Sequence, residues 1–531
     1  MKMTLLAPTP PDISSFGVRA LSSYLRSKGH QTKIVFLPGS IGLLKEGGTF
    51  VYTYSDKTLD QITDLCRDSD LIGVSFMSNY YDRAITVTQA IKKSLKVPVI
   101  WGGIHPSCKP EECLEYADMV CVGEGEDALL ELFERMSGGG DVHGVPGVWS
   151  RKGAEIVRNG HRPLIRDLDV LPHFDFSNEG HYIYARDSRD IVPLTDDIFK
   201  KTLPVLPYFD GSLKTAFRTM TDRGCPHKCA YCNMSNIKEM YRDEGTPFLR
   251  ARSIGNVIDE LVTMKNKFPF VEVVQFFDDT FFARPFKQIE QFSALYREKV
   301  SLPFYCQASP TTLTEEKLKC LVDAGLVYVE MGIQTGSKKI KELYHRPESN
   351  EKILEVTNLL HKYRSRIMTP DYHVIIDNPW ETTDDILDTV RLLFKIPKPY
   401  GLCISSLVFF PGTELYNKAF GEGLIKDETT DIYRKPFYIP PKKTYPNFLI
   451  YLLTFQHFPR WILSPMIGDR AVKLFSRVKV GPLYSLFYAV GESLRLVIKG
   501  WKAFTRGDWK RIGDYLKRLI MHDPVVAGRK Q

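Results

Sequence analysis

The sequence predicts an α/β protein with a helical C-terminal region, and three observations support this. Short apolar runs alternate with amphipathic segments through residues 1–150, which is typical of a doubly wound parallel sheet. The alternation resumes in residues 214–425, where six strand–helix units predict an open (β/α)6 barrel. After residue 425 the segments become apolar, basic and helical. We therefore expect a first domain at 1–150, a connector at 151–213, a barrel at 214–425 and a helical region at 426–531.

The first domain contains five expected strands separated by amphipathic helices. The expected strands are Met3–Ala7, Thr32–Leu37, Leu71–Met77, Val97–Trp101 and Met119–Val122, and three of the helices are Val18–Lys28, Tyr81–Lys93 and Asp127–Met136. In the connector, Val145–Ser150 and Ala154–Arg158 predict a small hairpin, whereas residues 182–212 are expected to be irregular.

Glycine-rich turns follow three of these strands. Doubly wound sheets bind ligands at the carboxyl ends of their strands, and glycine lets the backbone approach a bulky ligand closely. Such turns also occur where the chain only reverses direction, so alone they leave both interpretations open. The residues concerned are Phe16, Gly17, Gly102, Gly103, Gly123, Glu124 and Gly125.

Three cysteines, Cys225, Cys229 and Cys232, follow a predicted strand with the spacing C-x3-C-x2-C. Soft thiolate ligands favour an iron–sulfur cluster, zinc or copper(I). A structural zinc site needs a fourth ligand, and the nearest candidate, His227, lies inside the motif. Three cysteines on a four-iron cluster leave one iron open to a further ligand. A zinc loop and unrelated buried cysteines are the alternatives.

This motif, with Tyr231 directly before the last cysteine, resembles the signature of radical S-adenosylmethionine (radical SAM) enzymes. The resemblance implies that a 4Fe-4S cluster on the three cysteines binds S-adenosylmethionine through its open iron. One electron then cleaves S-adenosylmethionine to a 5′-deoxyadenosyl radical. It also implies an electron donor such as flavodoxin or ferredoxin.

Polar residues end several barrel strands, where barrel enzymes place their chemistry. By the same resemblance, S-adenosylmethionine contacts come from the end of the second strand and from the fourth. The alternatives are that Asp278 and Asp279 cap a helix and that Glu330 and Gln334 are ordinary polar residues of the barrel interior. The expected contacts are Phe277, Asp278, Asp279, Glu330, Gln334 and Ser337.

The order of the glycine turns in the first domain resembles the cobalamin-binding domain of a radical SAM subgroup that includes methyltransferases and anaerobic cyclase-like enzymes. The seven turn residues named above are then expected to contact cobalamin. The D-x-H-x-x-G motif of histidine-ligated cobalamin is absent, because Asp141 and His143 stand in the wrong place with the wrong spacing. The resemblance therefore implies cobalamin without a histidine lower ligand, the alternative being a vestigial domain.

The expected function is radical modification of an unactivated carbon by methylation. The same radical used for cyclisation, oxidation or carbon–carbon coupling of a hydrophobic substrate is the alternative within the enzyme class. A non-catalytic cobalamin- or metal-sensing protein is the alternative outside it. The discriminating observation is cleavage of S-adenosylmethionine by the reduced protein. The sequence does not name the substrate.

Composition places the protein in a reducing compartment. Its ten cysteines show no disulfide framework, and the first residues contain no apolar stretch of signal-peptide length. We therefore expect a cytoplasmic protein, and no window is apolar enough for a spanning helix. The formal charge of +8 is modest for 531 residues. The basic residues lie in apolar segments, so a nucleic-acid partner is not expected.

After a proline- and lysine-rich hinge at residues 439–446, the C-terminal region contains apolar and basic helical segments. One interpretation is a helical cap that closes the barrel around substrate, with its basic face in water. The other is peripheral contact with the anionic inner face of a membrane through Phe, Trp, Lys and Arg. The expected helices are Phe448–Phe455, Trp461–Ile467, Arg470–Val478, Leu483–Trp501 and Trp509–Met521.

Overall fold

The computed structural model describes residues 1–8, 13–44, 50–434, 442, 444–456, 458–477 and 481–505. The chain divides into two compact units. The first comprises Met1–Gln307, Glu315–Val327 and Phe409–Lys435. The second comprises Ala308–Thr314, Tyr328–Val408 and Pro436–Gln531.

The first unit begins with a parallel sheet whose five central strands have the order β2-β1-β5-β6-β7. By order of appearance this is 2-1-3-4-5, the flavodoxin-like order of doubly wound sheets. The strands are almost entirely buried, which explains why they are continuous apolar runs in the sequence. All five expected strands are confirmed: β1 (Lys2–Ala7), β2 (Gln31–Phe36), β5 (Leu71–Ser75), β6 (Val99–Gly102) and β7 (Met119–Cys121).

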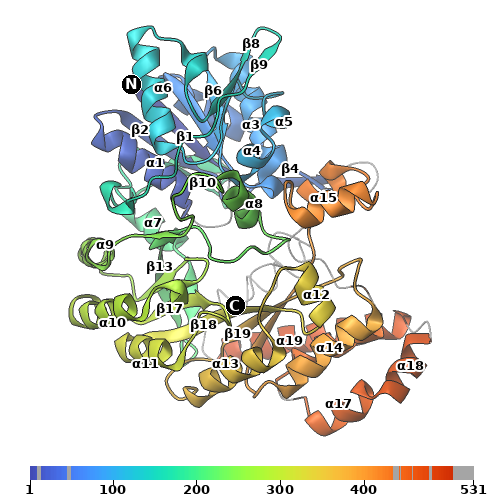
Figure 1. The fold of residues 1–531 in the computed structure, drawn as a ribbon. Helices are drawn as coiled ribbons and strands as arrows, with labels where there is room; N and C mark the ends of the chain where they lie inside the picture. The colour runs from blue at the N-terminus through green and yellow to red at the C-terminus, as the bar shows by residue number, and fades with distance from the viewer. Residues whose placement is uncertain are drawn as a thin grey trace. The chain divides into compact units, whose positions relative to one another are not determined.

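Helices cover both faces of this sheet (Figure 1). Helix α1 packs against α6, and α2 packs against α3. A short hairpin of β3 (Ile41–Leu44) and β4 (Phe50–Thr53) lies between β2 and α2 in the chain. The helices are α1 (Phe16–Ser27), α2 (Asp56–Cys66), α3 (Tyr81–Ser94), α4 (Ile104–Cys108), α5 (Pro110–Cys113) and α6 (Glu126–Gly138).

The connector is more regular than the sequence predicts. The hairpin of β8 (Val148–Lys152) and β9 (Glu155–Val157) is confirmed and extends the sheet beyond β7. The expectation of irregular structure over 182–212 is wrong, because four elements form there. Strand β10 pairs with β2 through only two residues, so the sequence there is too short to show a recognisable strand pattern. The elements are β10 (Tyr182–Ala185), β11 (Asp190–Pro193), α7 (Asp196–Thr202) and β12 (Val205–Pro207).

The six expected parallel strands of the barrel are present, three assigned mainly to each unit. In the first unit they are β13 (Leu213–Thr219), β16 (Val273–Phe276) and β17 (Phe304–Ala308), with α9 (Ile254–Lys267), α10 (Phe286–Leu295) and α11 (Glu315–Ala324). In the second they are β18 (Leu326–Gln334), β19 (Asp371–Ile376) and β20 (Gly401–Ser406), with α12 (Lys338–Leu343), α13 (Asn350–Lys362) and α14 (Thr383–Lys395).

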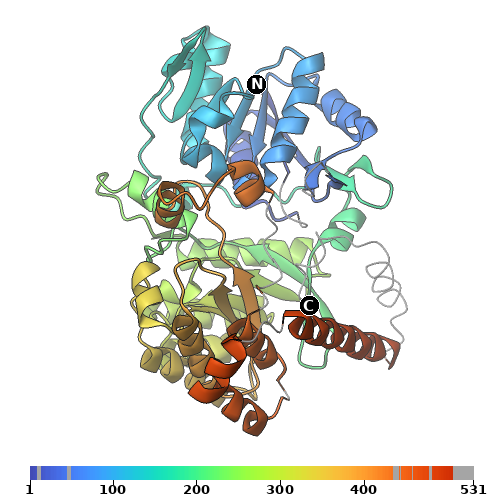
Figure 2. The same ribbon diagram turned by 90° about the vertical axis from the view of Figure 1, so that its right-hand side faces the viewer.

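The second unit also holds the C-terminal helices, and four of the five expected ones are confirmed. The fifth, Trp509–Met521, lies outside the described residues. Helix α16 is buried along its whole length and begins at Tyr445, so the expected hinge ends earlier than residue 446. The helices are α16 (Tyr445–Leu453), α17 (Arg460–Ile467), α18 (Asp469–Arg477) and α19 (Gly481–Thr505), the last drawn in dark red in Figure 2.

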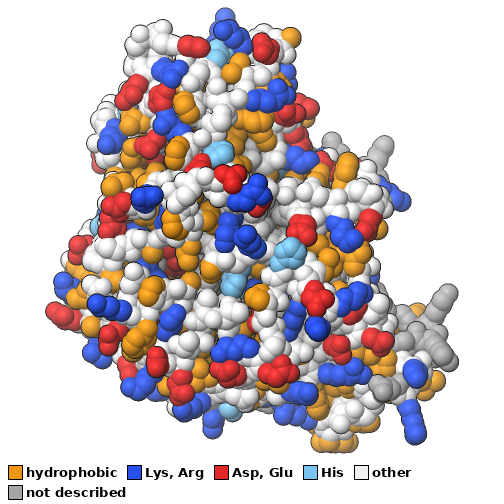
Figure 3. All heavy atoms as spheres, viewed as in Figure 1, with side chains coloured by type: hydrophobic (Ala, Val, Ile, Leu, Met, Phe, Trp, Pro, Cys, Tyr) orange, Lys and Arg blue, Asp and Glu red, His pale blue; other side chains and the backbone are white. Residues whose placement is uncertain are grey.

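Basic and acidic side chains are interspersed over the face drawn in Figure 3. Within the described part of the chain, no helix has the length and apolar character needed to cross a membrane.

Candidate active site

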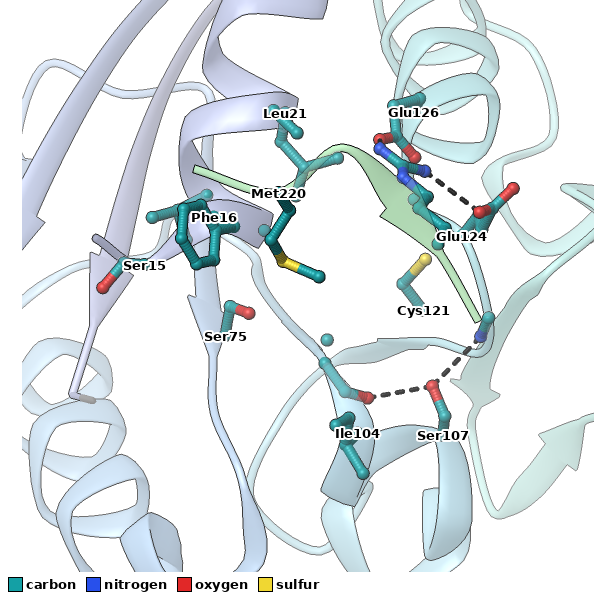
Figure 4. A pocket seen from close by; sticks show the side chains of 18 of the residues that line it. Ser15, Phe16, Leu21, Ser75, Ile104, Ser107, Cys121, Glu124, Glu126 and Met220 are labelled. Carbon is teal, nitrogen blue, oxygen red and sulfur yellow. Dashed lines mark hydrogen bonds and ion pairs between the residues drawn. The ribbon is translucent and has the colours of Figure 1, made fainter. Parts of the chain in front are cut away.

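A cavity of about 680 Å³ lies within the first unit, at the carboxyl ends of β1, β5, β6 and β7. This is the edge where doubly wound sheets bind ligands, and the volume suits a small-molecule site. One wall comes from the N-terminal sheet and α1. The other comes from the chain around β13, including Met220, whose side chain projects into the space beside Phe16 (Figure 4).

All seven residues predicted to contact cobalamin line this cavity. A Cβ added to Gly17 or to Gly102 would meet a single atom, 3.8 Å away, so the missing side chains leave open space. At Gly103 φ is +100°, and a Cβ would stand 2.8 Å from the carbonyl oxygen of Phe76. A side chain is therefore excluded at Gly103 by the backbone, whereas Gly17 and Gly102 enlarge the room for a ligand.

Ser107 holds two of the glycine turns together. Its hydroxyl donates to the carbonyl oxygen of Gly103 at 2.9 Å and accepts from the backbone N–H of Gly123 at 3.0 Å (Figure 4). Ser107 is not among the residues that the sequence predicts for this site. Its role depends on a contact between two turns, and no local sequence pattern predicts such a contact.

Among the described residues that line the cavity, none is a histidine. The histidine of the second turn, His105, is completely buried away from it, with Nδ1 3.1 Å from the Ser78 hydroxyl. Burial lowers the pKa of His105 to about 3, so the ring is neutral at ordinary pH. The donor set of the cavity therefore fits cobalamin held by glycine turns and apolar side chains.

Glu124 lines the cavity and is also the centre of an ion-pair network. Its carboxylate lies 3.0 Å from both Arg223 Nη1 and Arg250 Nη2. The backbone N–H of Ile165 donates to its second oxygen at 2.9 Å. Burial raises the pKa of Glu124, but the hydrogen bond from Arg250 and the charge of Arg223 outweigh this and lower it overall. Glu124 is therefore a carboxylate that fixes the turn after β7.

The cysteine loop starts at the same network. Strand β14 (Asp222–Arg223) pairs with β15 (Arg250–Ala251), and the loop then runs to α8 (Asn233–Met240). Lys238 of α8 donates to the carbonyl oxygen of Pro226 at 2.9 Å. Charged side chains therefore fix the start of the loop, Arg223 through Glu124 and Pro226 through Lys238.

The three loop cysteines are thiols that form no disulfide, and Cys229 is buried. Burial, followed by the charge of Asp279, raises the pKa of Cys225 to about 12. Burial also raises the pKa of Cys232, to about 11. Thiolates at such positions need a nearby cationic centre, which a cluster supplies.

Within the described residues, no three Cys, His, Asp or Glu side chains are grouped to hold a single metal ion. Each cysteine of a four-iron cluster binds a different iron atom, so its thiols do not converge on one point. The sequence spacing of Cys225, Cys229 and Cys232 supplies three thiolates, one fewer than the four ligands of a structural zinc site.

The residues that follow β16 have different roles. Asp278 is fully buried and accepts hydrogen bonds from the backbone N–H groups of Thr221 and Asp222 at 2.5 and 2.9 Å. It therefore holds the chain that enters the cysteine loop. Asp279 and Phe277 line the cavity. Burial, and then the charge of Asp278, raise the pKa of Asp279 to about 6.

The remaining predicted contacts lie in the second unit. Glu330 and Gln334 are half-buried on β18, and Gln334 has a φ of +66° at the strand end. The Ser337 hydroxyl donates to Asp385 at 2.6 Å and caps α12 by accepting from Ile340. Ser337 is thus engaged within its own unit. Contact of these three residues with S-adenosylmethionine stays a prediction.

The helix that follows the cysteines, α8, also contributes to the site without having been predicted from the sequence. Met234, Ile237 and Tyr241 pack with Leu164 and Phe248, and Tyr241 reaches the cavity. A Cβ on Gly123 would stand 1.9 Å from the Tyr241 hydroxyl oxygen, so this ring requires the glycine. The signal is an apolar stripe at helical spacing, which by itself indicates only packing.

The fold and the cavity define a protein that joins a ligand-binding doubly wound sheet to a cysteine-loop barrel. Two family models match these parts: the B12 binding domain over residues 3–133 and the radical SAM superfamily over residues 221–393. The chain is a radical SAM enzyme with an N-terminal B12-binding domain. The matched domains imply S-adenosylmethionine and cobalamin as cofactors. A 4Fe-4S cluster on the three cysteines stays a prediction.

Several known proteins resemble large parts of the chain. An uncharacterized methyltransferase of Pyrococcus horikoshii is 24% identical over 452 residues, which is 84% of this chain and 87% of that protein. The hopanoid C-3 methylase of Methylococcus capsulatus is 23% identical over 323 residues, 60% of this chain and 54% of that protein. The structure of the methyltransferase TsrM from Kitasatospora setae, with cobalamin and a [4Fe-4S] cluster, covers 79% of this chain and 78% of its own, with a TM-score of 0.58 and 17% identity.

Proposed function

We propose that this enzyme methylates an unactivated carbon of a hydrophobic substrate, converting a C–H bond into a C–CH3 bond. When the cofactors are bound, they supply reductive cleavage of S-adenosylmethionine to a 5′-deoxyadenosyl radical, and a methyl group for transfer. The protein holds the substrate where both can reach the same carbon.

One observation carries the proposal: a single cavity is lined both by the glycine turns and by the start of the cysteine loop. Gly102 and Gly103 lie on one side, and Arg223 and Gly224, directly before Cys225, lie on the other. A ligand held by the turns therefore lies beside the chain that carries the cluster. This arrangement favours chemistry that uses both cofactors on one substrate.

Part of the lining supports an apolar substrate. Met220, Met234, Ile237 and Phe277 contribute apolar surface to the cavity. These side chains offer a hydrophobic substrate an apolar surface, next to charged residues of the same cavity such as Asp279 and Arg223. The methyltransferase names of the relatives, one of them acting on a hopanoid, support both methyl transfer and a hydrophobic substrate.

The deciding experiment uses the anaerobically reconstituted full chain with hydroxocobalamin, a reductant and S-adenosylmethionine labelled in its methyl group. 5′-Deoxyadenosine reports reductive cleavage, and S-adenosylhomocysteine reports methyl transfer. We expect both, together with a labelled product heavier by one methylene. 5′-Deoxyadenosine without S-adenosylhomocysteine, and a product that has lost hydrogens, would instead favour cyclisation or oxidation. Neither product from a fully loaded protein would reject an enzymatic role.

A further inference from the structure

The short helix α4 lies between the cobalamin cavity and the elements that hold the cysteine loop. On one side of the helix, Ile104 and Ser107 line the cavity. On the other side, α4 contacts α8, which begins directly after Cys232. There the side-chain amide of Asn236 donates to Sγ of Cys108 at 3.1 Å. A helix of five residues therefore reaches both the cavity and the end of the cysteine loop.

The residue directly after α4, Lys109, holds a second helix, α15 (Glu414–Gly421). The Lys109 ammonium donates to the Tyr416 hydroxyl oxygen at 2.9 Å and lies 3.0 Å from a carboxylate oxygen of Glu428. The side chains of Lys109 and Glu428 are 27% and 25% exposed, so water competes with the pair only in part. Lys109 Nζ also lies 4.9 Å from the centre of the Tyr416 ring. Lys109 therefore fixes the side of α15 that carries Tyr416.

Helix α15 is bonded directly to the cysteine loop. The backbone N–H of Leu415, in the first turn of α15, donates to the carbonyl oxygen of Ala230 at 3.0 Å. Ala230 is buried and stands between the second and third cysteines of the loop. The Thr413 hydroxyl caps α15 by accepting from the backbone N–H of Tyr416, so the end of the helix that meets the loop is fixed. A displacement of α15 therefore displaces the middle of the cysteine loop.

The segment that carries α15 is anchored separately at its far end. The Tyr433 hydroxyl donates to the Glu112 carboxylate at 2.9 Å. Arg434 donates to both carboxylate oxygens of Asp82, at 2.8 and 3.3 Å. Glu112 and Asp82 belong to α5 and α3 of the N-terminal sheet domain. Loss of the Lys109 contacts should therefore loosen α15 without detaching the segment.

We propose that Lys109 is a positioning residue, which holds the middle of the cysteine loop in place relative to the cobalamin turn after β6. It acts through α15, by way of the contacts from Lys109 to Tyr416 and from Leu415 to Ala230. A cluster on the loop and a ligand in the cavity have to lie at a fixed separation to act on one substrate. The inference concerns the placement of the loop, so it holds whether the radical leads to methylation or to another product.

The test is hydrogen exchange of the full-length, anaerobically reconstituted protein, followed by mass spectrometry for the backbone amides of residues 225–232. Lys109→Met keeps a side chain of similar length and loses the ammonium group. We expect the loop amides of this variant to exchange at least about fivefold faster than those of the wild type, because α15 restrains the loop less. Lys109→Arg retains donors for Tyr416 and Glu428 and should restore most of the protection.

The matched control is Lys92→Met, on α3. The Lys92 ammonium likewise lies near a carboxylate, that of Asp118 at 2.6 Å, and donates to a carbonyl oxygen, that of Tyr116. Lys92 is not part of the cavity lining. Because both ion pairs are partly exposed, the two Met variants should lose similar amounts of global stability. Only Lys109→Met should accelerate exchange in the cysteine loop.

Formation of 5′-deoxyadenosine at saturating S-adenosylmethionine provides the second measurement. It should fall about tenfold in Lys109→Met, return in Lys109→Arg and stay at the wild-type rate in Lys92→Met. The proposal is overturned if the loop amides of Lys109→Met exchange as in the wild type, or if Lys92→Met accelerates them equally. A wild type that forms no 5′-deoxyadenosine would contradict the enzymatic assignment instead, and the exchange rates alone would then decide the role of Lys109.

Discussion

Glu124 Oε1 lies 3.0 Å from Arg223 Nη1, which joins the glycine turn after β7 to the residue two positions before Cys225. Arg223 also reaches Glu126 at 2.5 Å, and Arg250 approaches Glu124 from the other side. The side chains of Arg250 and Glu126 are 5% and 4% exposed, so the pairs are largely withdrawn from water. The network therefore fixes the cobalamin-side turn against the start of the cluster loop.

Removing the central carboxylate should destabilise the fold. In Glu124→Gln, Arg223 and Arg250 lose the carboxylate that they share. Arg223 is partly exposed and Arg250 is buried, so water replaces the lost partner poorly. We expect a loss of about 2–3 kcal/mol in the free energy of unfolding, measured by urea denaturation. In the control, Glu111→Gln breaks an exposed pair with Arg158 and should cost less than about 1 kcal/mol. Equal losses in the two variants would show that the network has no special role.

The three loop cysteines should be individually indispensable for the cluster. Replacing Cys225, Cys229 or Cys232 by Ala removes one iron ligand each, and we expect loss of iron and of 5′-deoxyadenosine formation. Cys320→Ala, on α11, is the control and should keep both. Iron content and product are measured on anaerobically reconstituted protein. A cysteine variant that retains full cleavage of S-adenosylmethionine would remove that residue from the ligand set.

The sequence predicts the parts of the site that are local and misses those that are not. The glycine turns and the cysteine spacing are contained in a few consecutive residues, and all seven turn residues line the cavity. Arg223 and Glu124 stand 99 positions apart, and no spacing rule links them. Tyr241 and Ser107 likewise act through contacts between separate turns and helices.

The fold shows the same division. Long buried strands such as β1 are evident from composition, because both faces of a parallel sheet are covered. Strand β10 has four residues, and only Tyr182 and Ile183 pair with β2. A signal this short is indistinguishable from an irregular loop, so the connector could not be predicted.

Gly102, the last residue of β6, provides a test of the cobalamin site. A Val at Gly102 has room within the fold, since only Cys121 lies within 4 Å of its Cβ, but the larger side chain occupies the cavity. Gly102→Val should therefore stay folded and bind hydroxocobalamin at least about tenfold more weakly, as followed by corrinoid absorbance. Gly138→Val is the control, because nothing surrounds that position and it is not in the cavity lining. Unchanged affinity in Gly102→Val would place cobalamin elsewhere.

His105 should make the protein sensitive to acid. Burial lowers its pKa to about 3, whereas in the unfolded chain the pKa is about 6.5. Between these values the unfolded state binds a proton that the folded state does not. Stability is therefore intact above pH 6.5 and falls as the pH decreases towards 3, by up to about 1.4 kcal/mol per pH unit from this group.

The measurement is urea denaturation at pH 7 and at about pH 5, where the unfolded imidazole is already protonated. In His105→Gln the amide cannot titrate and can still bond the Ser78 hydroxyl, so the variant should lose less stability between the two pH values than the wild type. His143→Gln, at a position half-exposed near β8, should respond to acid as the wild type does. If wild type and His105→Gln lose the same stability on acidification, the buried ring is not the group responsible.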